Sequence, residues 1–255
     1  MRTVALPWDL GHATPLDATQ TCDWILGPAR TSSRPRILGN LNLHALHLTL
    51  EPGPVRELTA RSDVILIDGW PILLLAKMSS RKSGWPTTRE RIGSTDWLAE
   101  LLARDPAITV VAVGGTPETA EKMARHVKTH TRSIRWHHFD GYRFSRAAES
   151  TGPDVLTGAL AGADLVLVGL GMPRQEKWIL DHLELIAPGA VIANVGGCFD
   201  YFAGTQRLAP RWMGRIGLEW LFRLAHSPRR LAKRYLVEPL VLISRLVRRG
   251  VRRHD

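Results

Sequence analysis

The chain has 255 residues, of which 44% are hydrophobic, so it suits one α/β domain with an appendage or two small domains. Its two cysteines, Cys22 and Cys198, are too few and too far apart to form a disulfide framework or a zinc site. The net charge is +10, and the whole excess lies in residues 207–255, where 13 basic side chains stand against three acidic ones.

Six short aliphatic or β-branched runs, each closed by turn residues and followed by a helical stretch, give the main structural signal. They occupy residues 36–42, 64–69, 108–115, 134–139, 164–169 and 191–197. Strands that alternate with helices predict an α/β, Rossmann-like fold with a mainly parallel sheet flanked by helices. Such a sheet binds ligands at the carboxyl ends of its strands. The residues at or just beyond those ends are Asn40, Asn42, Asp68, Gly114, Gly115, Gly141, Gly171 and Gly197.

Asp68 closes a strand of four aliphatic residues and precedes Gly69, so its carboxylate is expected at the open edge of the sheet. This position suits a general base. The alternative is an aspartate that caps the following helix. Arg91, in the segment 89–96, could pair bidentately with a phosphate, and a solvated surface arginine is the alternative there.

The fifth run joins a buried strand to a helix through glycines. The strand, residues 164–168, stops before Gly169 and Gly171, and we expect the helix to begin at Pro173, a residue that suits the first helical position. Backbone N–H groups at such a junction can bind an anion. Arg174 stands where a third glycine would complete a dinucleotide fingerprint, so the sequence favours a phosphate-binding turn over a full nicotinamide site.

Gln175 and Glu176 are expected in the first turn of that helix. The neutral amide of Gln175 can donate to a phosphate or sugar oxygen, whereas the carboxylate of Glu176 complements the helix dipole and is expected to be structural. Asp200 follows a glycine pair at the next strand end. It could accept a hydrogen bond from a ribose hydroxyl or a base N–H, and the alternative is an aspartate that caps a turn.

The spacing of histidines and carboxylates does not indicate a metal site. His137 and His138 alternate faces of a strand, and His44 and His47, three residues apart on a predicted helix, have no evident third ligand. The sequence has no Asp-x-Asp pair to hold a metal-bound nucleotide sugar. We therefore expect no metal and no cofactor, and we expect cationic side chains to stabilise a leaving phosphate.

Residues 207–255 combine basic side chains with large apolar ones, which favours anionic lipid over nucleic acid as a partner. Glu238 and Pro239 interrupt the apolar run, which falls short of the ~20 residues that a spanning helix needs. We expect a basic amphipathic helical appendage that lies on a membrane surface. A hinge at 204–210 would join it to a core of residues 1–206.

The first ten residues contain no apolar core of signal-peptide length, because Pro7 and Asp9 interrupt them. Export is therefore not expected. Together with the appendage, this predicts a peripheral protein at the cytoplasmic face of the inner membrane.

Several segments of the chain form an ordered set of motifs. They are DG at 68–69, Arg91, VGLGMPRQE at 168–176, GGCFD at 196–200, AG at 203–204, RLAP at 207–210, GLEWLFR at 217–223 and PRR at 228–230. Over roughly residues 34–240 the chain resembles the WecG/TagA/CpsF glycosyltransferases, glycosyltransferase family 26. As a set the motifs are specific, although each alone is weak.

The resemblance implies an inverting enzyme that moves a sugar from a UDP donor onto an undecaprenyl-diphosphate-linked sugar, typically N-acetylmannosamine onto N-acetylglucosamine. Asp68 matches the proposed base that deprotonates the acceptor hydroxyl. Asn42 and Arg91 match residues of the pocket. Gln175 matches a residue that contacts the donor.

The resemblance also implies roles for residues near the uridine and in the tail. Asp200 and Tyr142 fall near positions expected to hold uridine. Arg223, Arg230 and Arg234 match or adjoin tail arginines that are thought to reach the diphosphate when the tail docks at the membrane.

The chain departs from the family at two pocket positions. Asn40 stands where the family usually has threonine, and Ser94 stands where it often has glycine. Some members serve exopolysaccharide or capsule pathways with other hexoses, so glucose or a uronic acid stays open as the transferred sugar.

Two alternatives belong to other functional classes. An NAD-dependent oxidoreductase would share the parallel sheet and the Gly-x-Gly turn. It would also need a third glycine and an acidic residue about twenty positions beyond the turn, where the nearest candidate, Glu184, lies inside a predicted helix. A non-enzymatic nucleotide-binding membrane adaptor would need no base at Asp68.

Overall fold

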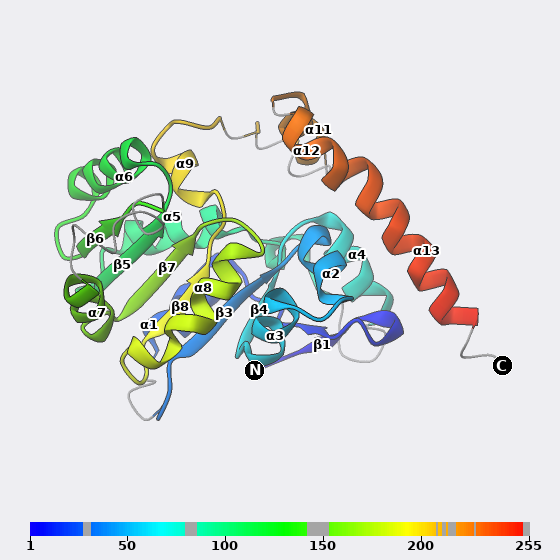
Figure 1. Ribbon diagram of the computed structural model, residues 1–255, viewed down its shortest axis with the longest axis horizontal. Coiled ribbons are helices and arrows are strands. Elements are labelled where there is room, and N and C mark those ends of the chain that lie inside the picture. Colours follow the sequence, from blue (N-terminus) through cyan, green and yellow to red (C-terminus); the bar gives the residue numbers. More distant parts are fainter. Residues whose placement is uncertain are drawn as a thin grey trace.

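Six strands form a parallel sheet, as the sequence predicts (Figure 1). The computed structural model describes residues 1–27, 32–79, 86–141, 153–207, 209–210, 213, 218–226 and 228–251. The strands are β3 (Arg36–Leu41), β4 (Val64–Ile67), β5 (Thr109–Gly114), β6 (Arg135–Phe139), β7 (Leu165–Gly169) and β8 (Val191–Asn194). Their order is β4-β3-β8-β7-β5-β6, and every pairing is parallel.

Both faces of the sheet are buried. In β5, Val110 and Ala112 pack in one core cluster, whereas Val111 and Val113 pack in another on the opposite face. Successive side chains of a strand point to opposite faces, so a strand covered on both sides needs apolar residues at every position. This explains why β4, β5, β7 and β8 are nearly continuously aliphatic, whereas the edge strand β6 is not.

Helices cover the two faces of the sheet (Figure 1). One layer holds α1 (Ala18–Leu26), α5 (Ser94–Arg104), α6 (Pro117–His130) and α9 (Cys198–Phe202), and the other holds α2 (Leu43–Thr49), α3 (Pro54–Arg61), α7 (Pro153–Ala161) and α8 (Arg174–His182). The short turns η2 (Thr88–Glu90) and η4 (Leu183–Leu185) are 3-10 helices. A sheet covered in this way on both faces is doubly wound, so the Rossmann-like prediction is confirmed.

A short N-terminal hairpin, which the sequence did not reveal, extends the core beyond β4. Strands β1 (Val4–Ala5) and β2 (His12–Ala13) pair antiparallel around the 3-10 turn η1 (Pro7–Asp9). Two-residue strands are too short to produce a periodic pattern. The backbone N–H of Thr14 donates to the Ile65 carbonyl at 2.7 Å, and α4 (Trp70–Ser79) packs on the hairpin.

The predicted helical appendage is present and packs on the core. It consists of α11 (Glu219–His226), α12 (Pro228–Ala232), the π-helical turn η5 (Lys233–Val237) and α13 (Glu238–Val251). In Figure 1, α13 runs past α2 and α4, and it contacts α2 and η1. Leu242 of α13 is buried in the same cluster as Leu46 of α2.

The appendage has two different faces. Leu231 is buried, and Glu238 and Leu242 are buried against the core. Leu236, Val237 and Leu240, which are 52%, 49% and 67% exposed, lie on another side of the same helical segment. We call these three residues the outward stripe, and their spacing of three and four residues places them on one helical face.

Pro239, expected to interrupt the apolar run, does not end the helix. It is the second residue of α13, where the missing N–H of a proline is tolerated, and the π-helical turn η5 comes just before it. Among the residues that the structure describes, no helix is both long and apolar enough to cross a membrane.

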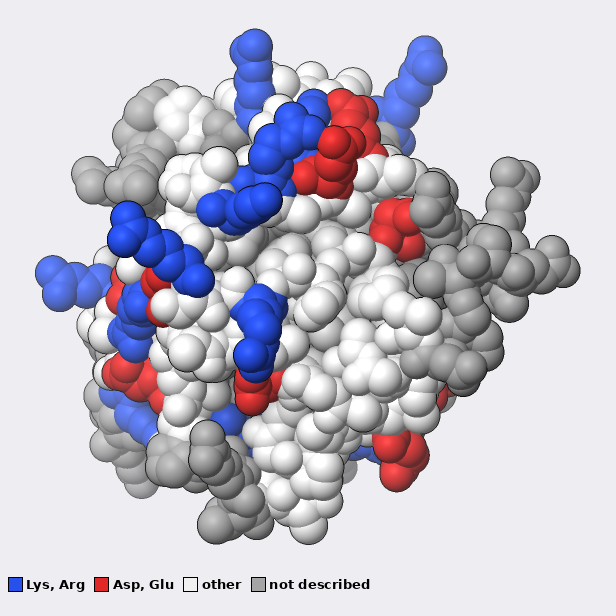
Figure 2. Space-filling model, turned by 90° about the vertical axis from the view of Figure 1, so that its left-hand side faces the viewer, with Lys and Arg blue, Asp and Glu red and all other residues white. Residues whose placement is uncertain are grey.

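At the end of the molecule farthest from α13, charged side chains of both signs are mixed among the described residues. Figure 2 shows Lys and Arg side chains interspersed with Asp and Glu among many uncharged residues on that face. On α6, Lys122 pairs with Glu118 and Arg125 with Glu121, each at 2.6 Å. This pattern fits the charge count, because residues 1–206 hold 21 basic and 21 acidic side chains.

Candidate active site

Asp68 lies at the carboxyl end of β4, and Asn42 fixes its position. The Asn42 side chain is the N-cap of α2, because its Oδ1 accepts from the Ala45 N–H at 3.0 Å. The other end of the same amide is therefore a donor, and Asn42 Nδ2 donates to Asp68 Oδ2 at 3.2 Å. The loop after β3 thus presents a hydrogen-bond donor to the carboxylate after β4.

Arginines of the appendage interact electrostatically with Asp68. Burial raises the pKa of the Asp68 carboxyl above its ordinary value, and the nearby Glu219 acts in the same direction. Arg223, the Asn42 amide and Arg234 oppose this rise. The charges that act on this partly buried carboxylate therefore come from the helical tail.

Arg223 is held among acidic and phenolic groups. It forms a salt bridge with Glu219 one turn earlier on α11, and its guanidinium lies 5.4 Å from the ring centre of Tyr201. Burial lowers the pKa of Arg223, but Glu219, Tyr201, Tyr235 and Asp68 together outweigh burial and raise it. A permanently charged guanidinium thus faces the end of β4.

Arg91 also lies beside the end of β4, as predicted. It forms an isolated parallel bridge with Ile67, and the N–H of the next residue, Ile92, donates to the Ile67 carbonyl at 3.0 Å. The guanidinium lies 5.7 Å from the ring centre of Trp70 at the start of α4. Asp68 and Arg91 are therefore brought to the same strand end by two separate segments.

The strand ends β5 and β7 meet closely at glycines. The connection after β5 leads outward to β6, whereas that after β7 leads to β8, so the two strands form a switch point of the sheet, where α/β folds bind ligands. A Cβ on Gly114 would collide with the Gly169 carbonyl. Gly115 and Gly171 follow on either side with positive φ, in the loops that lead to α6 and α8.

The helix after β7 begins one residue later than predicted. Pro173 is the N-cap of α8 rather than its first helical residue, with φ of −89° and ψ of 6°. The preceding bond, Met172-Pro173, is cis, so the chain turns before the helix starts. The first two side chains after Arg174, those of Gln175 and Glu176, point into the protein and are each 1% exposed.

Gln175, Glu176 and Asn194 form a buried network of hydrogen bonds. Glu176 Oε1 accepts from Gln175 Nε2 at 2.7 Å and from Asn194 Nδ2 at 2.9 Å. Gln175 Oε1 accepts from the Gly196 N–H at 3.1 Å. Gln175 therefore joins α8 to the loop after β8, and its contact with a donor stays a prediction.

Glu176 is a buried carboxyl held by amides. Its Oε2 has no hydrogen-bond partner among the described residues. Burial raises its pKa above the ordinary value, while the bonds from Asn194 and Gln175 act against the rise. The structural role expected for Glu176 fits this environment, although its contact is with side-chain amides rather than only with the helix dipole.

Asn40 extends the same network toward Asp68. Its Nδ2 donates to the Asn194 carbonyl at 2.5 Å and lies 3.2 Å from Ser94 Oγ. The residue before Ser94, Gly93, lies close to Asp68: a Cβ atom built on Gly93 would be 3.7 Å from Asp68 Oδ1. The two positions at which this chain departs from the family pattern, 40 and 94, are thus in direct contact.

Asp200 lies on α9 beside the first turn of α6. Thr119 Oγ1 donates to Asp200 Oδ1 at 3.0 Å, and Thr205 Oγ1 lies 3.3 Å from the same oxygen. The residue is therefore close to the loop of Gly115 at the switch point, as expected for a residue of the ligand edge. Its predicted contact with uridine stays a prediction.

Two predicted residues cannot be placed. Tyr142 lies outside the described residues, and Arg230 belongs to α12, but its side chain is outside them. Arg234, by contrast, is described, and its guanidinium lies 5.9 Å from the ring centre of Tyr235. Among the described residues, no group of three or more His, Cys, Asp and Glu could hold a metal ion.

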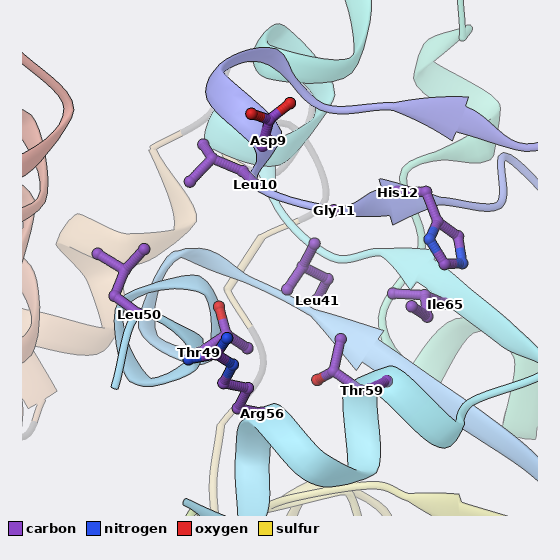
Figure 3. A pocket seen from close by; sticks show the side chains of 11 residues that line it. Asp9, Leu10, Gly11, His12, Leu41, Thr49, Leu50, Arg56, Thr59 and Ile65 are labelled. Atoms are coloured by element: carbon purple, nitrogen blue, oxygen red, sulfur yellow. The ribbon is translucent and has the colours of Figure 1, made fainter. Parts of the chain in front are cut away.

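A separate cavity of about 240 Å³ lies between the N-terminal hairpin, α2 and α3 (Figure 3). Leu10, Leu41, Arg56 and Ile65 are among the residues that line it. Its volume is below the ~300 Å³ at which ordinary ligand pockets begin. Because its lining includes none of the predicted site residues described above, we do not assign it to the active site.

Sequence reasoning missed Asn194 and Glu219. Asn194 is a polar residue at the end of an aliphatic strand, the same signal that identified Asp68, but it lay inside the run 191–197. Glu219 lies in the motif GLEWLFR, but its role was not predicted, because its pairing with Arg223 and its effect on Asp68 depend on the fold of the tail. The described residues thus bring a carboxylate, amide donors and arginines to one edge of a Rossmann-like α/β protein.

Comparison with known proteins agrees with this class. The glycosyl transferase WecG/TagA/CpsF family matches residues 11–255, and the chain belongs to this family. A protein of Bacillus subtilis (strain 168), N-acetylglucosaminyldiphosphoundecaprenol N-acetyl-beta-D-mannosaminyltransferase, is 30% identical over 175 residues. The match covers 68% of this chain and 64% of that relative, just under two thirds of its length.

Proposed function

We propose that the protein is an inverting glycosyltransferase of bacterial cell-surface or exopolysaccharide biosynthesis. It would move a sugar from UDP-N-acetylmannosamine, or from another UDP-hexose or UDP-uronic acid, to an undecaprenyl-diphosphate-linked saccharide. The family match supports the reaction class, and the name of the Bacillus subtilis relative supports a lipid-linked diphosphate acceptor and an N-acetylmannosaminyl donor group.

The observation that carries this proposal is Asp68 at the end of β4. A hydroxyl of the acceptor would approach this carboxylate, which Asn42 orients through its 3.2 Å hydrogen bond. Asp68 would accept the hydroxyl proton as the oxygen attacks the anomeric carbon of the donor. UDP would leave from the opposite side, which inverts the configuration at that carbon.

Positive charge is the second requirement of this reaction. The leaving diphosphate gains negative charge as the glycosidic bond breaks, and fixed cationic groups stabilise such a transition state. Arg223 and Arg234 interact with Asp68, and Arg91 lies at the same strand end. We assign Arg91, Arg223 and Arg234 to the phosphate groups, and no metal is needed in this scheme.

The donor would extend along the carboxyl edge toward the switch point. Its diphosphate or uridine would lie over Gly115 and Gly171, where the absence of side chains leaves the backbone accessible. Asp200, which accepts a hydrogen bond from Thr119 at 3.0 Å, would accept another from a ribose hydroxyl or a base N–H. Asn40 and Ser94 lie between this region and Asp68, so we propose that they contact the transferred sugar.

The appendage would place the protein on the cytoplasmic face of the membrane. The outward stripe exposes apolar side chains, and residues 207–255 carry 13 basic groups, each worth about 1 kcal/mol near anionic lipid. Surface binding requires both features. Vesicle binding that weakens as salt is raised would support this placement, and binding that persists in Leu236→Ser with Leu240→Ser would count against the stripe.

The direct test of function is turnover. The protein is incubated with each UDP-sugar of a panel in turn and with a lipid-diphosphate acceptor, and a gain in product mass shows which donor is used. We expect one UDP-sugar to be transferred and NAD not to bind. Tight NAD binding without UDP binding would favour an oxidoreductase, and UDP binding without any transfer across the panel would favour a non-enzymatic adaptor.

A further inference from the structure

Helix α2 carries contacts to both Asp68 and the appendage. Its N-cap, Asn42, donates to Asp68, and two residues later His44 Nδ1 lies 2.6 Å from Glu238 Oε2 at the start of α13. The second contact joins residues 194 positions apart in the chain. The start of this short helix therefore contacts both the Asp68 carboxylate and the appendage.

We propose that His44 and Glu238 are positioning residues whose contact holds the appendage on the core, so that Arg223 and Arg234 face Asp68. This inference rests on the proposed function for its catalytic part only. The docking itself is a property of the fold and can be tested without any substrate.

Both side chains of the His44–Glu238 contact are largely buried, so the contact is expected to contribute to stability. The side chains of His44 and Glu238 are only 18% and 10% exposed, so neither group could regain full hydration if its partner were removed. A buried polar group without a partner is strongly unfavourable. The pair therefore favours one docked position of α13 over a loose association through apolar side chains alone.

The contact does not require a charged histidine. Burial lowers the pKa of His44, and Arg234 and His47 act in the same direction, against the hydrogen bond and charge of Glu238. A neutral imidazole with its proton on Nδ1 can donate to the Glu238 carboxylate. The hydrogen bond is therefore compatible with neutral pH.

Arg234 connects the contact to Asp68. It precedes Glu238 by four residues, across the π-helical turn η5, and its charge acts on both His44 and Asp68. Residues four apart lie on the same side of a helix. Fixing Glu238 against α2 therefore also fixes the face of the helix from which Arg234 reaches the carboxylate.

A second polar contact between tail and core supplies a matched control. Arg245 Nη1 lies 2.7 Å from Glu51 Oε1, but these side chains are 38% and 63% exposed. Exposed ion pairs of this kind contribute little. Removing the Arg245 charge should leave the docked position nearly unchanged, whereas removing the Glu238 carboxylate should not.

The test uses the full chain and four variants: Glu238→Leu, Glu238→Gln, His44→Asn and the control Arg245→Ala. Leucine removes the acceptor but keeps an apolar side chain on α13. Glutamine keeps an acceptor oxygen, and asparagine at 44 keeps a donor near the position of Nδ1. Circular dichroism and thermal unfolding first establish that each variant is folded.

Hydrogen exchange measured by mass spectrometry reports docking directly. In Glu238→Leu we expect amides of α2 and of 238–251 to exchange several-fold faster, with little change in the sheet, because local opening sets exchange at such positions. Glu238→Gln, His44→Asn and Arg245→Ala should exchange like the wild type. Unchanged exchange in Glu238→Leu would overturn the docking role.

Kinetics with a water-soluble acceptor analogue report the catalytic consequence without membrane binding. We expect Glu238→Leu to lower kcat about tenfold or more, since small misplacements of catalytic groups have large effects, and to leave the donor KM within about twofold. Glu238→Gln should restore kcat. Faster exchange with a normal kcat would show that docking does not serve catalysis, and absence of turnover in the wild type would reject the proposed function while the exchange result still stands.

Discussion

Two carboxyls at one edge of the sheet, Asp68 and Glu176, have different surroundings. Burial raises the pKa of both. Glu176 is 1% exposed, and its described hydrogen bonds come from the amides of Gln175 and Asn194. Asp68 is only partly buried, accepts from one amide and interacts with two arginines of the tail.

The difference indicates which carboxyl can exchange protons with a substrate. Burial favours the uncharged form of a carboxyl, and the hydrogen bonds that Glu176 accepts from amides suit it to hold neighbouring segments in place. A carboxyl near fixed positive charge and open on one side can ionise and accept a proton. Environment rather than residue type therefore separates the two roles, and each of the following predictions tests that separation.

Replacing Asp68 by asparagine should have the largest effect. The amide keeps the shape of the side chain but cannot accept a proton, so turnover should fall roughly 10²-fold or more. Folding and UDP affinity should stay close to the wild type. Turnover near the wild-type rate, measured with the same acceptor, would remove Asp68 from the role of base.

Replacing Glu176 should affect stability rather than turnover chemistry. In Glu176→Ala the amides of Gln175 and Asn194 lose a buried acceptor, which costs about 1–3 kcal/mol for each unsatisfied group. Glu176→Gln keeps an acceptor oxygen and should lose less than about 1 kcal/mol. Urea unfolding measures both, and equal losses in the two variants would contradict a network that depends on hydrogen bonding.

The pH dependence of stability should distinguish Glu176→Gln from the wild type. Because the folded pKa of Glu176 is raised, the unfolded chain releases this proton at lower pH than the native protein does. The contribution of Glu176 to the free energy of unfolding should therefore decrease as pH rises from the ordinary glutamate pKa to the raised one. The glutamine variant should lack this decrease, and parallel pH curves would contradict a raised pKa.

Replacing Arg223 by glutamine should move the pH dependence of catalysis. Arg223 lowers the pKa of Asp68, and Glu219 would lose its salt-bridge partner in the variant, so both changes raise that pKa. A base acts only when deprotonated, so the acid limb of kcat/KM should shift to higher pH. We also expect a loss of about tenfold at neutral pH, the size of one charge-assisted contact of ~1.4 kcal/mol.

Chelation should have the smallest effect. Amides and arginines surround the two carboxyls, so neither needs a metal to be held in place. Activity measured with and without EDTA should agree within error. Loss of activity in EDTA that magnesium or manganese restores would mean that the phosphate groups are held by an ion rather than by Arg91, Arg223 and Arg234.

The fold was predictable because β4, β5, β7 and β8 are nearly continuous aliphatic runs with turn residues at their ends. The same rule brought Asp68, Asn42 and Asn40 to one edge. It did not predict the partners of those residues, since hydrogen bonds such as Asn194 to Glu176 depend on how α8 packs across the sheet. Pro173 was placed one residue too far into its helix for a similar reason, because local preference does not fix a helix boundary.

In the tail, the sequence predicted the type of helix but not the role of one of its residues, Glu238. In the sequence, Glu238 interrupts an apolar run and indicates only that the segment does not span a membrane. In the structure it is buried against His44, 194 positions away. Composition can predict that a helix is amphipathic, but a buried polar residue with a partner on the core can be recognised only from tertiary contacts.

The buried and exposed faces of η5 and α13 would also determine the distance between the pocket and the membrane. In the proposed arrangement the outward stripe rests on the lipid while Glu238 and Leu242 face the core, so the helix is a spacer between the two. A helix with its side chains is about 10–12 Å across. The pocket would therefore stand about that far above the headgroups, and the reach of the acceptor's polar head would limit which lipid-linked saccharides can be extended.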